Sequence, residues 1–483
     1  MKIVRRMCIG GVLAFALVFT TATLPADAQQ RSVAHAALEI DDAELAPDFW
    51  IARLTQADHL MLDRAAIDAQ NAAMIAGDPS MHDLRALPAQ LTRDQVIRWI
   101  KALGAAPQGP LMDLRGAPIS SPTFAAILAN RNLDAIAATN PMRYGLVVHR
   151  AALRRLPSHQ FAYRADDPFK LDRLQESALF PGDAVVLAHA SRDGQWAFVI
   201  SETYAAWIEH AAVAIGSADE VFGYAQATPF RIITAATTQT ASTPEQAPLS
   251  RLQLDMGLRL PLARSETPRS IIHGQGALGS HVLELPWRRA DGRLMFAPAL
   301  LPRSADSSSD YLPLTQANVL RQAFKFLGER YGWGHADGAR DCSGFVSEVY
   351  RSFGLKLPRN TGDQAASPVL RKRVFGAGDD HAARIAALRA ARVGDLVYLP
   401  GHVMLVIGQL DGLPWVIHDT TGFAYTDGTG RLLQQTANGV VVTPLAPLRT
   451  GKGEPWVDVM TAIVRIAADV PGDADVPANR LPR

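Results

Sequence analysis

Residues 341–350 have the sequence DCSGFVSEVY, and this stretch decides how the C-terminal third of the chain folds. Its apolar residues, from Phe345 to Tyr350, recur at helical intervals, which predicts a helix that begins at or near Cys342. The free backbone N–H groups and the positive dipole end of that helix would then surround the thiol. This position predicts a lowered thiol pKa and donors for an oxyanion, as acyl transfer requires.

The first 28 residues have the form of an export signal. Basic residues precede an apolar run (9–19), and Ala26-Asp27-Ala28 has the small-x-small pattern of a cleavage site. The run is shorter than the ~20 apolar residues that a bilayer crossing needs, so we predict an exported protein of the periplasm or cell envelope with no membrane span. Cys8 leaves with the signal. Cys342 is then a lone thiol that cannot form an internal disulfide, which favours a chemical role.

The composition is typical of a globular chain. Of its residues 48% are hydrophobic and 20% are charged, and 48 basic against 47 acidic residues give a formal net charge of +1. This balance offers no electrostatic case for a nucleic-acid partner. A chain of 483 residues exceeds what one hydrophobic core usually serves, so we expect several domains, in a monomer.

Changes in pattern along the chain place the domain boundaries. Apolar residues recur at helical intervals over 47–130, the period changes to two after Pro141, and short apolar runs over 229–301 are separated by glycines. The paired aromatic strands over 194–208 resemble the end of a bacterial SH3-like barrel, and we interpret 229–301 as a second, more divergent barrel. A polar stretch at 304–310 predicts a linker. The predicted division is a signal peptide (1–28), a helical N-terminal region (29–140), two small all-β SH3-like barrels (141–222 and 223–303), a catalytic domain (311–468) and a disordered tail (469–483).

Two histidines follow Cys342 where a base could reach the thiol. The runs 394–399 and 402–408 predict two strands joined by a short turn, so His402 opens the second strand. His418 lies on the next predicted strand, and it neighbours His402 if the strands form a meander. A cysteine nucleophile needs a base that a third group orients, which makes these three residues the candidate catalytic set.

The order of motifs over residues 312–466 resembles the NlpC/p60 family of cell-wall cysteine peptidases. The matching pieces are YGWG at 331–334, DCSG at 341–344, LPRNT at 357–361 followed by Gln364, GDL at 394–396, HV at 402–403 and IH at 417–418. The upstream layout is similar to that of multidomain members of the family. The resemblance implies a multidomain α+β fold with a papain-like catalytic domain. It also implies hydrolysis of the bond between γ-D-glutamate and a diamino acid, meso-diaminopimelate or lysine, in peptidoglycan stem peptides.

The catalytic roles of the family transfer to matching positions in this chain. By resemblance, Cys342 is the nucleophile, His402 is the general base and then the acid, and His418 orients His402. A histidine in the third role is neutral at pH 7, so it selects the tautomer of His402 without supplying the negative charge of an aspartate.

The resemblance also implies four substrate-binding residues, of which Tyr331 lines the oxyanion side of the cleft while Asp341 and Ser343 contact the peptide. The chain departs from the family at two positions. His335 stands where a second glycine commonly follows the tryptophan. Asn360, the fourth residue, replaces an aspartate that pairs with the free ammonium of L-Ala in members acting on released peptides. Because Asn gives no charge pairing, we hypothesise that this enzyme acts on stems still attached to glycan.

Other interpretations stay open at the level of sequence. The protein could be a non-enzymatic wall-binding scaffold with a degenerate peptidase domain, or a related amidase or acyl transferase. Tyr331 could be a core aromatic, and His418 with Asp419 could be a surface pair. A zinc site of His335, Cys342 and His402 is disfavoured because the mature chain has no second cysteine. No phosphate loop or dinucleotide motif is present, so we expect neither cofactor nor metal.

Overall fold

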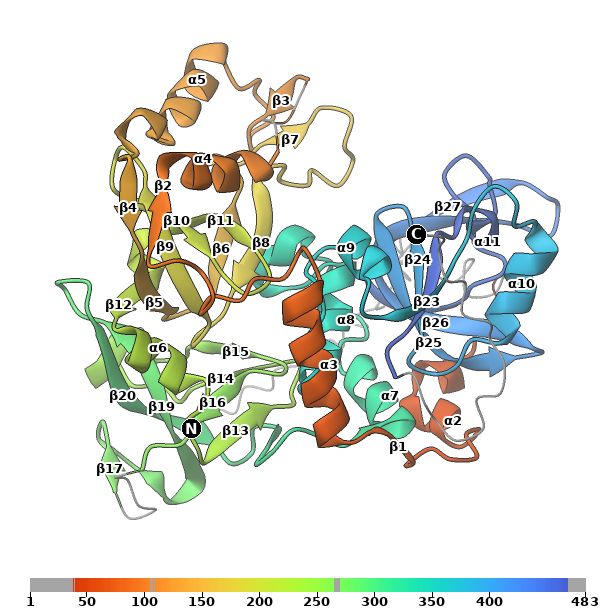
Figure 1. Cartoon of the computed structure of the whole chain (residues 1–483). Coiled ribbons are helices and arrows are strands. Elements are labelled where there is room, and N and C mark those ends of the chain that lie inside the picture. The colour runs from red at the N-terminus through yellow and green to blue at the C-terminus, as the bar shows by residue number, and fades with distance from the viewer. Residues whose placement is uncertain (1–37, 39, 105–106, 108, 265–269, 468–483) are drawn as a thin grey trace, which may run out of the picture.

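The computed structural model describes residues 38, 40–104, 107, 109–264 and 270–467 (Figure 1). The predicted signal peptide and the predicted disordered tail lie outside these residues. No helix within the described ranges combines the length and the apolar character that a bilayer crossing requires.

The N-terminal region is mostly helical. Its helices are η1 (Asp42–Leu45), α2 (Pro47–Ile51), α3 (Arg64–Gly77), α4 (Arg93–Ala102), α5 (Ser121–Asn130) and η2 (Leu133–Ala135). The sequence did not predict its short strands, β1 (Leu60–Leu62), β2 (Gln90–Thr92), β3 (Leu111–Met112) and β4 (Thr139–Pro141). β1 pairs with a strand beyond residue 300, β2 with β4, and β3 with a strand near residue 163. Such distant pairings leave no local periodicity, which is why the sequence pattern missed them.

The first β region (residues 141–222) is built on a seven-stranded antiparallel sheet with the order β12-β5-β9-β10-β11-β6-β8. The strands are β5 (Arg143–Val147), β6 (Ala151–Arg154), β8 (Gln175–Leu179), β9 (Ala184–Ala190), β10 (Trp196–Ile200), β11 (Ala205–Glu209) and β12 (Val213–Gly216), with β7 (Tyr163–Arg164) paired to β3, η3 (His210–Ala212) between β11 and β12, and α6 (Ala218–Tyr224) at the end. The predicted aromatic hairpin is β10 and β11, in which Phe198 faces Trp207.

The second β region (residues 223–303) consists of smaller sheets. Its elements are β13 (Phe230–Ile233), β14 (Thr237–Gln239), η4 (Pro244–Leu249), β15 (Gln253–Asp255), β16 (Arg259–Pro261), β17 (Ile271–Ile272), β18 (Gln275–Gly276), η5 (Ala277–Gly279), β19 (Ser280–Arg288) and β20 (Leu294–Pro302). The predicted linker at 304–310 is wrong in part, because it contains β21 (Ser307–Ser308), which pairs with β13. Its serines are compatible with an edge strand as well as with a linker.

The C-terminal region carries a six-stranded antiparallel sheet with the order β23-β28-β24-β25-β26-β27 (Figure 1). Its elements are β22 (Leu314–Thr315), α7 (Gln316–Phe324), η6 (Trp333–Gly338), α8 (Cys342–Arg351), α9 (Thr361–Ala366), β23 (Arg371–Val374), α10 (His381–Arg389), β24 (Leu396–Leu399), β25 (His402–Leu410), β26 (Leu413–Thr426), β27 (Leu432–Pro444), α11 (Trp456–Val459) and β28 (Ala462–Arg465). The expected meander is confirmed, because β24, β25 and β26 are consecutive neighbours.

The six-stranded sheet has an apolar core on each face. Phe345, Val349 and other residues of α8 pack with alternate strand residues such as Leu405 and Ile417. The opposite face packs Met404 and its neighbours against α10 and α11. A sheet covered on both sides needs strands that are apolar at nearly every position, as β24 and β25 are.

The regions are in contact with one another around α8. Figure 1 shows α3 between the β regions and the C-terminal sheet. There Arg64 donates to the carbonyl of Phe353 at 3.0 Å, and Asn71 donates to that of Gly354 at 2.7 Å. Helix α3 therefore binds the C-terminal region directly.

Candidate active site

The predicted helix after Asp341 is present, and Cys342 is its first residue. Asp341 is the N-cap residue, and its Oδ1 accepts from the backbone N–H of Gly344 at 2.8 Å. Capping satisfies one of the free N–H groups of the first turn and leaves that of Cys342 beside its own thiol.

The Cys342 thiol is enclosed, with 5% of the residue exposed. Its Sγ lies 3.7 Å from Thr361 Oγ1 and 3.9 Å from the carbonyl oxygen of Gly401. Burial, together with the negative charge of Asp341, raises the pKa of the thiol to about 12. The predicted lowering of this pKa is therefore wrong for the resting site, because desolvation of the thiolate outweighs the helix terminus.

The two histidines meet on neighbouring interior strands of the sheet, β25 and β26. His402 Nε2 lies 2.9 Å from His418 Nδ1, and His418 Nε2 lies 3.1 Å from Thr443 Oγ1. If His402 Nδ1 is to accept a proton, its own proton is on Nε2, so His402 donates to His418, which in turn donates to Thr443. This chain of tautomers leaves Nδ1 of His402 as the free basic nitrogen.

Trp456 covers the histidine pair, with its ring centroid 5.5 Å from that of His402 and 5.7 Å from that of His418. Burial lowers the pKa of His402 to about 4 and that of His418 well below its ordinary value. Both imidazoles are therefore neutral at pH 7. The alternative that His418 and Asp419 form a surface pair is wrong, because both residues are 0% exposed.

The side chains of Asp341 and Ser343 both accept hydrogen bonds from an arginine. Arg359 donates from Nη1 to Ser343 Oγ at 2.9 Å and to Asp341 Oδ1 at 3.1 Å, and from Nη2 to Asp341 Oδ2 at 2.8 Å. Burial opposes ionisation of Asp341, but Arg359 outweighs it and lowers the pKa of that carboxyl to about 2. Contact of these two side chains with a peptide stays a prediction.

The other two predicted substrate-binding residues are Tyr331, which precedes Asp341 in the chain, and Asn360, which follows Arg359. Tyr331 is half-buried, and its backbone N–H donates to the carbonyl of Asn438 at 3.1 Å. Asn360 is exposed and donates from Nδ2 to Asp363 Oδ2 at 2.8 Å. Both positions are compatible with substrate binding, which stays a prediction for each.

Sequence reasoning missed several residues of the site. Thr361 contacts the thiol, Trp456 covers the histidines, and Thr443 ends the tautomer chain. Asp419 is buried, and neither of its carboxylate oxygens has a hydrogen-bond partner among the described residues. Only the LPRNT motif pointed to Thr361, and Asp419 was noted only as a neighbour of His418; Thr443 of β27 and Trp456 of α11 lie far along the chain and gave no signal.

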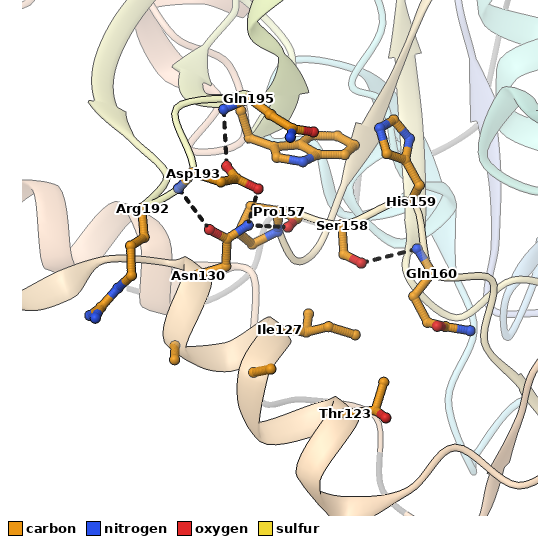
Figure 2. A pocket seen from close by; sticks show the side chains of 13 residues that line it. Thr123, Ile127, Asn130, Pro157, Ser158, His159, Gln160, Arg192, Asp193 and Gln195 are labelled. Carbon is orange, nitrogen blue, oxygen red and sulfur yellow. Dashed lines mark hydrogen bonds between the residues drawn. The ribbon is translucent and has the colours of Figure 1, made fainter.

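Two cavities lie away from the thiol. One of about 850 Å³ separates α5 from the first β region, and Figure 2 shows Ile127 and Asn130 of α5 facing Pro157 and His159 across it. Its polar groups bond to each other, as in the 3.1 Å contact of Asn130 Nδ2 with Asp193 Oδ2. The other, of about 560 Å³, lies at the junction of the β regions with α8. Cys342, His402 and His418 line neither cavity.

Among the described residues, no cluster of three His, Cys, Asp or Glu side chains could hold a metal ion.

Comparison with known proteins places families on two parts of the chain. Residues 328–453 match the NlpC/P60 family, and residues 161–209 match an SH3 domain of the SH3b1 type. The chain is 36% identical over 63 residues to the gamma-D-glutamyl-L-lysine dipeptidyl-peptidase of Bacillus subtilis, covering 12% of this chain and 21% of that one. It is 44% identical over 50 residues to the probable endopeptidase p60 of Listeria seeligeri, covering 10% of each chain. The chain thus spans only about a tenth to a fifth of the length of these relatives.

A solved structure supports the fold over most of the molecule. The NlpC/P60 endopeptidase from Photobacterium damselae subsp. piscicida is similar with a TM-score of 0.67 and 16% identity, over 86% of this chain and 96% of that one. The second SH3-like barrel stays a prediction. The protein therefore contains an NlpC/P60 domain, with Cys342, His402 and His418 inside it, preceded by an SH3 domain of the SH3b1 type.

Proposed function

We propose that this protein is a cysteine endopeptidase that hydrolyses the γ-D-glutamyl-diamino acid bond of peptidoglycan stem peptides. The observation that carries the proposal is the His402–His418 contact of 2.9 Å, in the domain where Cys342 begins α8. The partial similarity to a gamma-D-glutamyl-L-lysine dipeptidyl-peptidase supports the choice of bond. Export to the periplasm or cell envelope agrees with such a substrate.

The proposed reaction begins from a neutral thiol and a neutral imidazole. His402 Nδ1 takes the thiol proton as Sγ attacks the γ-carbonyl carbon of D-glutamate, and the backbone N–H of Cys342 donates to the oxyanion. The Nε2–H of His402 keeps its bond to His418 while the ring is positively charged. His402 then gives the proton to the leaving amine, and a water molecule hydrolyses the thioester by the same route in reverse.

Mass spectrometry of reaction products tests this proposal. Purified sacculi and a free L-Ala-γ-D-Glu-diaminopimelate tripeptide are incubated with the mature protein, with Cys342→Ala and with His381→Gln, which changes an exposed histidine of α10. New diaminopimelate amino termini should appear with the wild type and with H381Q and be absent with C342A. If the wild type cleaves neither substrate, the endopeptidase proposal is wrong, and a scaffold or another acyl bond takes its place.

We further propose that the enzyme accepts stems still linked to glycan. Asn360 carries no charge, and its amide is engaged by Asp363. A neutral amide at this position gives the ammonium of a free L-Ala no charge pairing. Cleavage of the free tripeptide far faster than of sacculi would contradict this second proposal and leave the first intact.

A further inference from the structure

His335 occupies a buried position against the nucleophile helix. It lies in η6 with a left-handed backbone (φ 62°) and is 5% exposed. A Cβ added to Gly344 would lie 2.5 Å from its Cε1, so only glycine fits beneath the ring. The imidazole therefore packs against the first turn of α8.

The partners of the ring define its tautomer. Arg359 Nη2 lies 2.9 Å from His335 Nδ1, and His335 Nε2 lies 3.2 Å from Glu348 Oε1. A guanidinium can only donate and a carboxylate only accepts, so Nδ1 accepts and the proton is on Nε2. Burial and then Arg359 hold the pKa of His335 well below its ordinary value. His335 is thus a neutral bridge between a cation and an anion.

One side of the bridge reaches the cap of α8. Arg359 binds both carboxylate oxygens of Asp341, and we name these two residues the capping pair. The same guanidinium donates from Nε to Ser177 Oγ of the first β region at 2.6 Å. Asp341, the N-cap residue, directly precedes Cys342, so the position of the capping pair bears on where α8 begins.

The other side of the bridge reaches the second β region. Glu348 Oε2 accepts from Arg340 Nε at 2.9 Å, and Arg340 Nη2 donates to Asp255 Oδ1 at 2.7 Å. We name Asp255 and Arg340 the interdomain pair; both are 0% exposed. Arg340 also donates to Glu329 at 2.9 Å, so its charge is fully compensated.

A buried charge network of this kind is costly unless every member is satisfied. Each nitrogen of the His335 ring has a partner of the correct type, Glu348 in α8 and Arg359 in the segment between α8 and α9. Among the described contacts no direct bond joins Glu348 to Arg359, so the imidazole is the hydrogen-bonding link between these two side chains.

We propose that His335 is a positioning residue that bridges Glu348 and Arg359, holds the capping pair in place and so keeps Cys342 in its attacking position. The kcat measurements described below rest on the proposed endopeptidase function, whereas the hydrogen-exchange measurement does not. The second β region then acts on the active site without touching substrate.

The test compares two replacements of His335. His335→Gln keeps one acceptor and one donor, whereas His335→Leu keeps only the approximate size. With sacculi as substrate, H335L should lower kcat about tenfold or more with little change in KM, because small displacements of a nucleophile are costly. H335Q should recover most of that loss. The H381Q variant serves as the matched histidine control.

Asp255→Asn tests the far end of the network. It should lower kcat in the same direction, and the double variant D255N/H335L should lose less than the sum of the two single losses, because both residues act on α8 through Glu348. Independent, additive losses, or an H335L kcat equal to that of H381Q, would overturn the proposal. If H335L does not fold, as judged by circular dichroism, D255N and H335Q decide.

Hydrogen exchange separates this proposal from the proposed function. In H335L and D255N, the amides of residues 341–346 should exchange faster than in the wild type and H381Q, whether or not any substrate is cleaved. Faster exchange in a protein that cleaves nothing would leave the positioning role standing and reject the endopeptidase. Unchanged exchange in both variants would reject the positioning role.

Discussion

At the scale of the residue, the active site combines a thiol and an imidazole that are both neutral at rest. Burial raises the pKa of Cys342 to about 12 and lowers that of His402 to about 4. Each shift disfavours the charged form, as desolvation does. In the proposed reaction, proton transfer is therefore part of the attack on the substrate, and no ion pair precedes it.

This neutral pair predicts the pH dependence of thiol alkylation. The rate at which iodoacetamide modifies Cys342 should rise with pH through the neutral range without a plateau, because the thiolate becomes populated only near its raised pKa. The measurement is mass-spectrometric alkylation across pH, with C342A as the blank. A plateau beginning in the acid range would instead indicate a thiolate–imidazolium pair.

Asp419 predicts a pH-dependent loss of stability. Its pKa is raised well above the ordinary value by burial, with Asp341 and Glu329 adding to the shift. The folded state therefore holds a proton that the unfolded chain releases above pH ~4, and stability falls as pH rises from there towards the folded pKa. Asp419→Asn removes this titration. Urea unfolding measures the free energy of unfolding of both proteins. The difference, D419N minus wild type, should increase by about 1.4 kcal/mol per pH unit within that window. A difference that does not vary with pH would show that Asp419 is ionised when folded.

At the scale of the element, two helices offer a matched comparison of N-caps. Asp341 caps α8 and Asp63 caps α3, each accepting a backbone N–H at 2.8 Å. Asp63 is exposed, whereas Asp341 also neutralises the buried Arg359. Asp63 therefore acts only as a helix cap, whereas Asp341 is both a cap and the partner of a buried cation.

The two caps predict different costs for the same substitution. Asp63→Ala should destabilise the protein by about 1 kcal/mol through the lost cap. Asp341→Ala should cost about 3 to 5 kcal/mol, because it leaves a buried guanidinium without its carboxylate. Urea unfolding of both variants measures the difference, and similar values for the two would argue against a strong Arg359–Asp341 pair.

The short helix α11 predicts a shift in the acid limb of activity. Trp456 shields both histidines, and burial is the cause of the low pKa of His402. Trp456→Leu admits water, so the pKa of His402 should rise and the loss of kcat/KM on acidification should begin at a higher pH. The pH–rate profile with sacculi checks this outcome. An acid limb identical to that of the wild type would mean that Trp456 does not control the desolvation of His402.

At the scale of the whole molecule, the regions are linked by buried contacts instead of flexible connections. Arg340 joins Asp255 to the C-terminal region, and Arg351 donates to the carbonyl of Met256 at 2.7 Å. The N-terminal Trp50 packs on Trp415 with ring centroids 5.5 Å apart. These contacts couple the stability of each region to that of its neighbours.

This coupling predicts one cooperative thermal transition for the described part of the chain. Differential scanning calorimetry should give a single peak, because separating the regions would strand buried charges such as Arg340. Asp255→Asn should shift the whole peak to lower temperature. Two resolved peaks in the wild type would show that the regions unfold independently.

The amino-acid pattern was sufficient to predict the candidate catalytic residues and the local structure around them. The DCSG motif placed Cys342 at the start of a helix, and alternating apolar residues placed His402 and His418 on adjacent strands, because periods of 3.6 and 2 residues reveal which face is buried. The lone thiol and the family resemblance identified the residues that carry the proposed reaction.

The protonation and the contacts of those residues, in contrast, depend on the packing of the whole molecule. The raised pKa of Cys342, the unpartnered Asp419 and the bridge formed by His335 all depend on groups more than ten residues away in the chain or on burial by distant strands. Desolvation is a property of the packed molecule, and no local pattern encodes it. For the same reason, the short strands of the N-terminal region became visible only once their distant partners were in place.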